Sequence, residues 1–243
     1  MRRIRNGVTL VGAVILVATG SLALAQEDGA GADGEASCPA PTFSARLLTP
    51  VAGRVPRDAS LLLALVPGGS LSGLPDGLQL RRGRRRTIAL QREEIAPGLY
   101  RLTPDTRRIW GRWNVEGVQG EPRIRFSRPG LPATPTTPRV SRVERYRVVS
   151  SEGSRVELKA HFEFPIPEGV VAVISHWGTD DEPDLWSQAV ATQNAAVLWS
   201  SSGECDPLPP GASAPPREGS VRVAFVDRYG QVSPISEPVS IPH

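Results

Sequence analysis

The sequence is poor in the side chains that most enzymes use for catalysis and metal binding. Its 243 residues include two cysteines, three histidines and one methionine. His161, His176 and His243 lie far apart, and none has a cysteine or carboxylate at metal-ligand spacing. Neither a Gly-x-Ser-x-Gly nor a Ser-x-x-Lys motif occurs. We therefore expect no metal, no cofactor and no catalytic residue, and interpret the chain as a non-enzymatic protein.

Helical periodicity and long apolar runs are equally scarce. Beyond residue 25 no segment repeats apolar residues about every 3.6 positions, and none is long enough to span a membrane. Residues 184–190 are the one candidate for a helical turn. Glycine and proline, with 24 residues each, instead separate short segments in which apolar and polar residues alternate. Because alternation puts the apolar side chains on one face of a strand, we expect an all-β protein.

The overall charge does not favour a nucleic-acid partner. The formal charge of +3 equals the contribution of Arg2, Arg3 and Arg5, so the remainder of the chain is neutral. That remainder is divided, with +5 over residues 26–133 and −5 over residues 134–243. Opposite charges on two adjacent domains predict a mutual attraction that salt would weaken.

The first 25 residues have the features of a secretory signal peptide. The three arginines precede an apolar stretch over residues 8–24, which ends in Ala23-Leu24-Ala25, a pattern that signal peptidase recognises. The alternative is an uncleaved membrane anchor. We favour cleavage after Ala25, which leaves no membrane span, and an exported protein that is periplasmic, extracellular or on the cell surface.

The two cysteines are Cys38 and Cys205, and an exported chain enters an oxidising compartment. An even count in such a compartment favours a disulfide between them. The bond would join the start of the mature chain to a loop near its end. Two free thiols are the alternative.

Two polar or proline-rich segments divide the mature chain. Residues 26–37 contain no large apolar side chain, so we expect residues 26–42 to form a disordered leader. Four prolines from Pro129 to Pro138 exclude a helix and interrupt a sheet, which makes residues 129–138 a linker. Residues 43–128 and 139–243 are each long enough to form one domain.

Both segments contain strand patterns separated by turn residues. In the first segment the patterns cover residues 60–66, 87–90, 99–102, 110–115 and 122–126. In the second they cover residues 155–164, 170–174, 195–199, 220–226 and 239–241. Short strands at this spacing predict a sandwich or a barrel.

A recognisable motif opens the first segment. Thr49-Pro-Val-Ala-Gly-Arg-Val-Pro-Arg-Asp58 has proline, glycine, Val-Pro and aspartate in an order that resembles bacterial immunoglobulin-like domains of the surface-layer type. The resemblance continues loosely through residues 99–104 and 113–115, and it covers about residues 43–126. It implies an immunoglobulin-like β-sandwich over residues 43–128 and transfers no catalytic residues.

A second motif lies near the end of the chain. Val221-Arg-Val-Ala-Phe-Val-Asp-Arg-Tyr-Gly-Gln-Val-Ser233 resembles the penultimate strand, hairpin and last strand of fibronectin type III-like domains of secreted bacterial proteins. The resemblance covers about residues 138–241, and it departs from the family at the long, proline-rich stretch 180–216. It implies a second β-sandwich in tandem with the first, and a fold by itself does not specify a function.

A cluster of arginines is the first candidate for ligand contact. It consists of Arg81, Arg82, Arg84, Arg85 and Arg86. Five guanidinium groups in six positions could bind an anionic polysaccharide, lipid headgroups or the acidic second domain. The alternative, which we favour, is a hairpin turn at Gly83 with solvated arginines on both sides.

Tryptophans are the second candidate. Trp110 and Trp113 point to opposite faces of a strand, so we expect at most one of them in the core and the other as an exposed contact. Trp177, which precedes the acidic residues 180–184, is another possible ligand contact. The acidic residues could bind Ca²⁺, but they lack the spacing of a calcium loop, so we expect a solvated loop.

Together these features predict a non-catalytic secreted or cell-envelope protein with a structural, adhesive or partner-binding role. The expected partner is an envelope protein or a polysaccharide. Two alternatives are a carbohydrate-binding module for cell-wall or extracellular polysaccharide and a periplasmic chaperone-like protein that acts through exposed strands.

Overall fold

The computed structural model describes residues 40–49, 54–106, 108–151, 153–178, 180–201 and 206–242. The predicted signal peptide, residues 26–39 of the predicted leader, Cys38 and Cys205 lie outside these ranges. By its internal contacts, the chain from Cys38 to His243 forms one unit. The described residues contain strands and no helix, which confirms the predicted all-β class.

The segment that precedes the linker contributes eight strands. They are β1 (Phe43–Leu47), β2 (Arg54–Pro56), β3 (Leu61–Pro67), β4 (Gln79–Arg82), β5 (Arg86–Ala96), β6 (Leu99–Pro104), β7 (Gly111–Glu116) and β8 (Arg123–Ser127). Hydrogen-bonded neighbours follow one another in the order β1-β3-β6-β5-β4-β7-β8-β2. The β2–β8 pair is parallel, and the other pairs are antiparallel.

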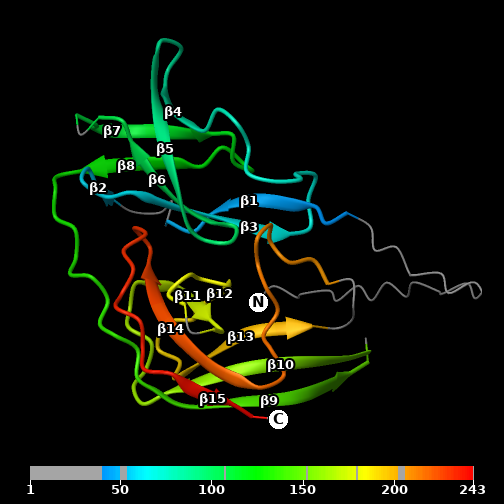
Figure 1. The fold of residues 1–243 in the computed structure, drawn as a ribbon. Helices are drawn as coiled ribbons and strands as arrows, with labels where there is room; N and C mark the ends of the chain where they lie inside the picture. The colour runs from blue at the N-terminus through cyan, green and yellow to red at the C-terminus, as the bar shows by residue number, and fades with distance from the viewer. Residues whose placement is uncertain are drawn as a thin grey trace, which may run out of the picture. The chain divides into compact units, whose positions relative to one another are not determined.

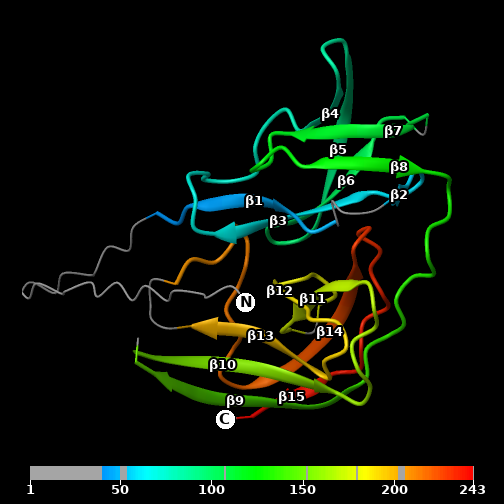
Figure 2. The same cartoon turned by 180° about the vertical axis from the view of Figure 1, so that it is seen from behind.

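Strand β5 belongs to two sheets (Figures 1 and 2). Its first residues pair with β4, from Arg86 to Ala89, and its remainder pairs with β6, from Leu90 to Ala96. One sheet is therefore β1-β3-β6-β5 and the other is β5-β4-β7-β8-β2. Apolar side chains from both sheets form a single buried cluster, so the two sheets enclose one core.

Alternation along the strands explains which residues enter this core. Ile124 and Phe126 of β8 are buried, while Arg123 and Arg125 between and beside them are exposed. Strand β7 has the same pattern, with Trp113 in the core. Burial of each large apolar side chain contributes roughly 1.5–3 kcal/mol to folding, so a shift of one residue in register would lose that contribution from both strands.

The segment that follows the linker contributes seven strands. They are β9 (Val140–Ser150), β10 (Gly153–Phe162), β11 (Val170–His176), β12 (Leu185–Gln188), β13 (Ala195–Ser201), β14 (Gly219–Asp227) and β15 (Val239–Ile241). They form a three-stranded sheet, β13-β10-β9, and a four-stranded sheet, β12-β11-β14-β15. Side chains from both sheets share a second buried cluster, in which Phe162 packs against Phe225 with ring centroids 5.1 Å apart.

One candidate element has a different structure. Residues 184–190 are a candidate for a helical turn in the sequence, but residues 185–188 form strand β12, which pairs with β11. Leu185 enters the second core from this strand, so ladder hydrogen bonds and apolar burial both favour the extended backbone. Residues 130–139, which contain most of the predicted linker, form neither helix nor strand.

A third buried cluster joins the segments on either side of the linker. Leu62, Ala64 and Leu99 of β3 and β6 belong to it, together with Ala172 and Ile174 of β11 and other apolar neighbours. Polar contacts accompany the cluster. The Thr49 hydroxyl donates to the Arg228 carbonyl at 2.8 Å, and Arg101 donates through Nε and Nη2 to the Gly230 carbonyl at 2.9 and 2.6 Å.

Candidate binding surface

Five exposed arginines share the outer face of the sheet that contains β4, β7, β8 and β2. The registers place Arg54, Arg125 and Arg112 in one row across β2, β8 and β7. Two residues further along the strands, Arg123 and Arg81 occupy a second row on either side of β7. We define these five residues, Arg54, Arg81, Arg112, Arg123 and Arg125, as the basic face.

The composition of this segment leaves the basic face short of counter-charges. Residues 43–128 contain sixteen arginines against seven acidic residues, a formal charge of +9. Within the described ranges, Arg81 is the only member of the basic face in an ion pair. Arg123 donates instead to the amide oxygen of Asn114, at 3.3 Å. Unpaired guanidinium groups on a sheet present planar donors that fit carboxylate, sulfate or phosphate oxygens.

Glu116 limits the basic face at one end. Its Oε1 accepts from Nη1 of Arg81 at 2.7 Å, and its Oε2 accepts from the Gln79 amide at 2.7 Å. The hydrogen bond from Arg81 holds the pKa of Glu116 below its usual value, and the same bond raises the pKa of Arg81. Both groups are therefore charged at neutral pH, and they neutralise each other in part.

The predicted arginine cluster forms the β4–β5 hairpin, which projects beyond the neighbouring strands (Figures 1 and 2). Gly83 opens the three-residue loop with a φ of +63°, a backbone conformation that glycine adopts without a steric penalty. Arg84, Arg85 and Arg86 are exposed and form no ion pair with another described residue. The expected hairpin at Gly83 is present, and β4 lies beside β7, so the cluster adjoins the basic face.

Trp110 connects the hairpin to the basic face. Nη1 of Arg82 donates to the Trp110 carbonyl at 3.0 Å, and the Trp113 indole donates to the same oxygen at 3.0 Å. The Trp110 ring is 49% exposed, with the guanidinium of Arg57 6.0 Å from the ring centroid. Trp113 is buried, so the expectation of one core and one exposed tryptophan agrees with the structure.

The structure places Trp177, the other tryptophan predicted as a ligand contact, in the second core. Trp177 is 6% exposed and belongs to the second core. Its indole donates to the Ser213 carbonyl at 3.2 Å, and its backbone amide donates to Oδ2 of Asp184 at 2.7 Å. The indole ring therefore contributes to the packing of the second core.

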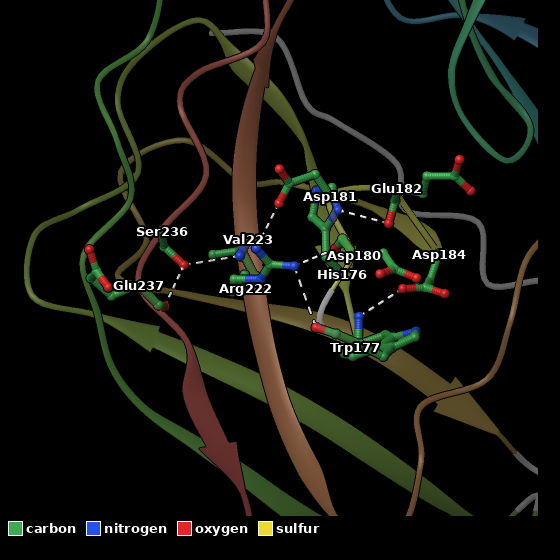
Figure 3. A network of polar contacts seen from close by, with 11 residues as sticks. His176, Trp177, Asp180, Asp181, Glu182, Asp184, Arg222, Val223, Ser236 and Glu237 are labelled. Carbon is green, nitrogen blue, oxygen red and sulfur yellow. Dashed lines mark hydrogen bonds and ion pairs between the residues drawn. The ribbon is translucent and has the colours of Figure 1, made fainter.

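The acidic residues 180–184 fold around basic and polar groups of the same segment (Figure 3). Arg222 of β14 donates to Oδ1 of Asp181 at 2.7 Å and also to the Asp180 carbonyl. The buried His176 ring bonds the Glu182 carbonyl at 2.9 Å through Nδ1. No group of three or more metal-ligating side chains occurs in the described part of the chain. Protein groups thus stabilise the loop, although Asp181 itself stays exposed.

Sequence reasoning found the hairpin and Trp110 but missed most of the surface around them. The missed residues are Arg54, Arg57, Arg112, Arg123 and Arg125. Alternation in residues 122–126 already indicated that Arg123 and Arg125 point away from the core. What the linear pattern does not contain is the neighbour relation of β2, β8, β7 and β4, which brings arginines from separate segments together.

Comparison with known proteins provides no independent assignment. No protein-family model matches the chain, and no curated protein matches it. Among the described residues, no helix has the length and apolar character needed to cross a membrane. The surface itself is therefore the basis for any functional conclusion.

Proposed function

We propose that this chain is an exported, non-catalytic protein of two tandem β-sandwiches that binds an anionic partner through the basic face. The observation that carries the proposal is the cross-strand row of Arg54, Arg125 and Arg112. Like charges that are neighbours on a sheet repel each other and destabilise it. A compensating anion outside the chain would remove that repulsion.

The strand order supports an immunoglobulin-like sandwich for the first segment. In constant-type immunoglobulin domains, strands A, B, E and D form one sheet and strands C, F and G the other. Taking β1, β3, β6 and the second part of β5 as A, B, E and D reproduces the first set. The order β4-β7-β8 then corresponds to C, F and G.

The second segment supports a related sandwich with one difference. In the same lettering, β9, β10 and β13 are strands A, B and E, and β11, β14 and β15 are C, F and G. The fourth strand, β12, pairs with β11 instead of β13. A seven-stranded antiparallel set of this kind fits the fibronectin type III-like domain that the motif at residues 221–233 suggested.

The uses of buried polar side chains support a role without catalysis. Asp227 accepts hydrogen bonds from the backbone amides of Tyr229 and Gln231, which holds a turn. The hydroxyls of Ser233 and Ser236 accept from backbone amides of β14 at 2.9 and 3.0 Å. Side chains that accept hydrogen bonds from buried backbone amides stabilise the fold, which is a structural role.

The proposal predicts that affinity for a polyanion follows the charge of the basic face. We expect the double variant R112Q/R125Q to bind immobilised dextran sulfate about tenfold or more weakly than the unmodified protein at low salt. Glu116→Gln should bind about threefold more tightly, because it removes the carboxylate that neutralises Arg81. Retention on the polymer at increasing salt measures both effects.

Glu168→Gln is the matched control for the gain in affinity. Glu168 is exposed on the second segment, and its replacement makes the same change in net charge away from the basic face. The proposal would be wrong if Glu116→Gln and Glu168→Gln had equal effects, or if R112Q/R125Q bound like the unmodified protein.

Export has its own measurement. The intact mass of the protein from cells should correspond to a chain that begins at Gln26. Comparison of the mass with and without reductant and a thiol-alkylating reagent tests the Cys38–Cys205 bond. A mass of the full 243-residue chain with two alkylated cysteines in both samples would contradict export and the bond together.

A further inference from the structure

We propose that the anionic partner is a linear acidic polysaccharide that lies across the strands of the basic face and stacks its last contacted sugar on Trp110. This inference rests on the proposed function and specifies the class of ligand. It requires that the guanidinium groups have a regular spacing, that a fixed aromatic ring adjoins them, and that competing polyanions fit the surface less well.

The spacing of the first row suits a polymer with one charge per sugar. Neighbouring strands lie about 4.8 Å apart, so the backbones that carry Arg54, Arg125 and Arg112 follow one another across the sheet at steps of about that length. A pyranose unit in a linear chain repeats at a similar distance. Each arginine can then form a charge-assisted pair with a carboxylate or sulfate on successive sugars.

The second row provides a boundary and polar contacts. Residues two positions apart on a strand are separated by roughly 6.6 Å, so Arg123 and Arg81 can contact the flank of a chain bound on the first row. Asn114 lies between them and offers an amide to sugar hydroxyls. Beyond Asn114, the carboxylate of Glu116 disfavours further anionic groups, which keeps the polymer on the first row.

Trp110 provides the stacking surface at the end of the strands. It directly precedes β7, and Arg57 directly follows β2, so both residues lie at the same end as the first row. The Trp110 carbonyl accepts two hydrogen bonds, which fix the backbone that carries the ring. The face of an indole ring is electron-rich and apolar, and it attracts the C–H groups of a pyranose ring.

Two other polyanions fit this surface less well. A stable membrane contact uses large exposed apolar side chains that enter the bilayer. The two rows of the basic face contain no such side chain. Proteins that bind single-stranded nucleic acid place several aromatic rings along the charged groove for successive bases. Here one exposed ring stands at the end of the rows.

The experiment measures affinity by isothermal titration calorimetry for five probes. They are polygalacturonate, dextran sulfate, neutral dextran, vesicles of phosphatidylglycerol in phosphatidylcholine, and single-stranded DNA. We expect both charged polysaccharides to bind at least tenfold more tightly than the vesicles and the DNA at matched salt, and neutral dextran not to bind. The ratio of the affinities for polygalacturonate and dextran sulfate shows whether the surface prefers carboxylate or sulfate groups.

Two pairs of variants test the individual contacts. Arg125→Gln should lower polysaccharide affinity about fivefold and reduce the slope of log affinity against log salt by about one. Arg147→Gln, which changes another exposed arginine, on β9, should change neither. Trp110→Ala should lower polysaccharide affinity about fivefold without changing the salt slope. Phe164→Ala is its control, because this ring is 63% exposed and also has an arginine guanidinium 6.0 Å from its centroid.

The outcomes separate the inference from the proposed function. Binding to no polyanion would overturn both. Binding to vesicles or DNA as tightly as to the polysaccharides would overturn the inference and leave the proposed function in place. If Trp110→Ala left polysaccharide affinity unchanged while Arg125→Gln lowered it, the inference would again be overturned and the proposed function would stay in place. Far-ultraviolet circular dichroism of each variant confirms that it is folded.

Discussion

At the scale of a single residue, His176 shows how burial couples protonation to folding. Its side chain is 4% exposed and bonds the Glu182 carbonyl through Nδ1. Burial lowers the pKa of His176, and the positive charge of Arg222 lowers it further, whereas the Glu182 carbonyl and the carboxylates of Asp184 and Asp181 raise it. The folded state therefore favours the neutral imidazole more than the unfolded state does.

The resulting pH dependence has a definite sign. Below the unfolded histidine pKa of about 6.5, the unfolded chain takes up a proton that folded His176 resists, so stability falls as pH decreases. The loss stops once the pH is below the lowered folded pKa. We expect the melting temperature of the protein to fall between pH 8 and pH 5 by more than that of His176→Asn, whose amide can still donate to Glu182.

The comparison needs only thermal unfolding of both proteins across this pH range. Acidic groups such as Glu116 and Glu144, whose pKa values are lowered in the fold, contribute equally to both curves and lose their effect at lower pH. Parallel curves for the two proteins would contradict the account of His176.

At the scale of the element, the turn between β5 and β6 requires a glycine at residue 98 for two reasons. One is the backbone conformation, and the other is a close contact with a distant segment. Gly98 has a φ of +74°, and a β-carbon added there would lie 2.5 Å from Cβ of Pro209. Gly77 has nearly the same φ, +73°, but its β-carbon would meet nothing within 4 Å. An added β-carbon would therefore cause similar backbone strain at both positions, but only at Gly98 would it also clash with a neighbouring side chain.

Alanine substitution at both positions separates these effects. Gly77→Ala should destabilise the protein by about 1 kcal/mol, the strain of a left-handed alanine. Gly98→Ala should cost about 2–4 kcal/mol, because the clash with Pro209 adds to that strain. Chemical denaturation measures both. Equal losses would show that the turn moves away from Pro209 without cost.

Elements with strong alternation were predictable, and those without it were not. The pattern at residues 155–164 predicted a strand, and β10 covers Gly153–Phe162, so the strand begins and ends two residues earlier than predicted. Strand β9 was missed because Arg142, Glu144 and Arg145 interrupt its apolar residues. Its extended form depends on pairing with β10 along nearly its whole length. The backbone hydrogen bonds of this β9–β10 hairpin leave no apolar alternation in the residues of β9 itself.

At the scale of the whole molecule, apolar packing joins the segments on either side of the linker. The opposite charges of the two segments predicted an electrostatic attraction, but no ion pair among the described residues connects them. Small side chains such as Ala64, Ala172 and Ala224 instead allow close approach of the sheets. Among the described residues, the basic face therefore has no ion pair with the second segment.

This packing predicts cooperative unfolding. We expect one thermal transition for the unmodified protein, because separation of the segments would expose the third cluster. Ala224→Asp places an unpaired carboxylate in that cluster at a cost of about 3–5 kcal/mol. The variant should unfold in two transitions, since Ala224 is not part of the second core.

Val190→Asp provides the control for that variant. Val190 is 52% exposed, so the same new charge should leave a single transition. Differential scanning calorimetry resolves the transitions. Two transitions in the unmodified protein, or one in Ala224→Asp at an unchanged temperature, would contradict the coupling.

The sequence by itself determined the all-β class, the faces of the clearest strands, the hairpin at Gly83 and the exposure of one of the two residues Trp110 and Trp113. These features follow from local physics, namely side-chain alternation, glycine conformation and the exclusion of proline from ladders. Only the tertiary structure decided that β2, β8, β7 and β4 are neighbours and that Trp177 is buried. Both depend on hydrogen bonds and apolar contacts between segments far apart in the chain, whose pairing no single segment encodes.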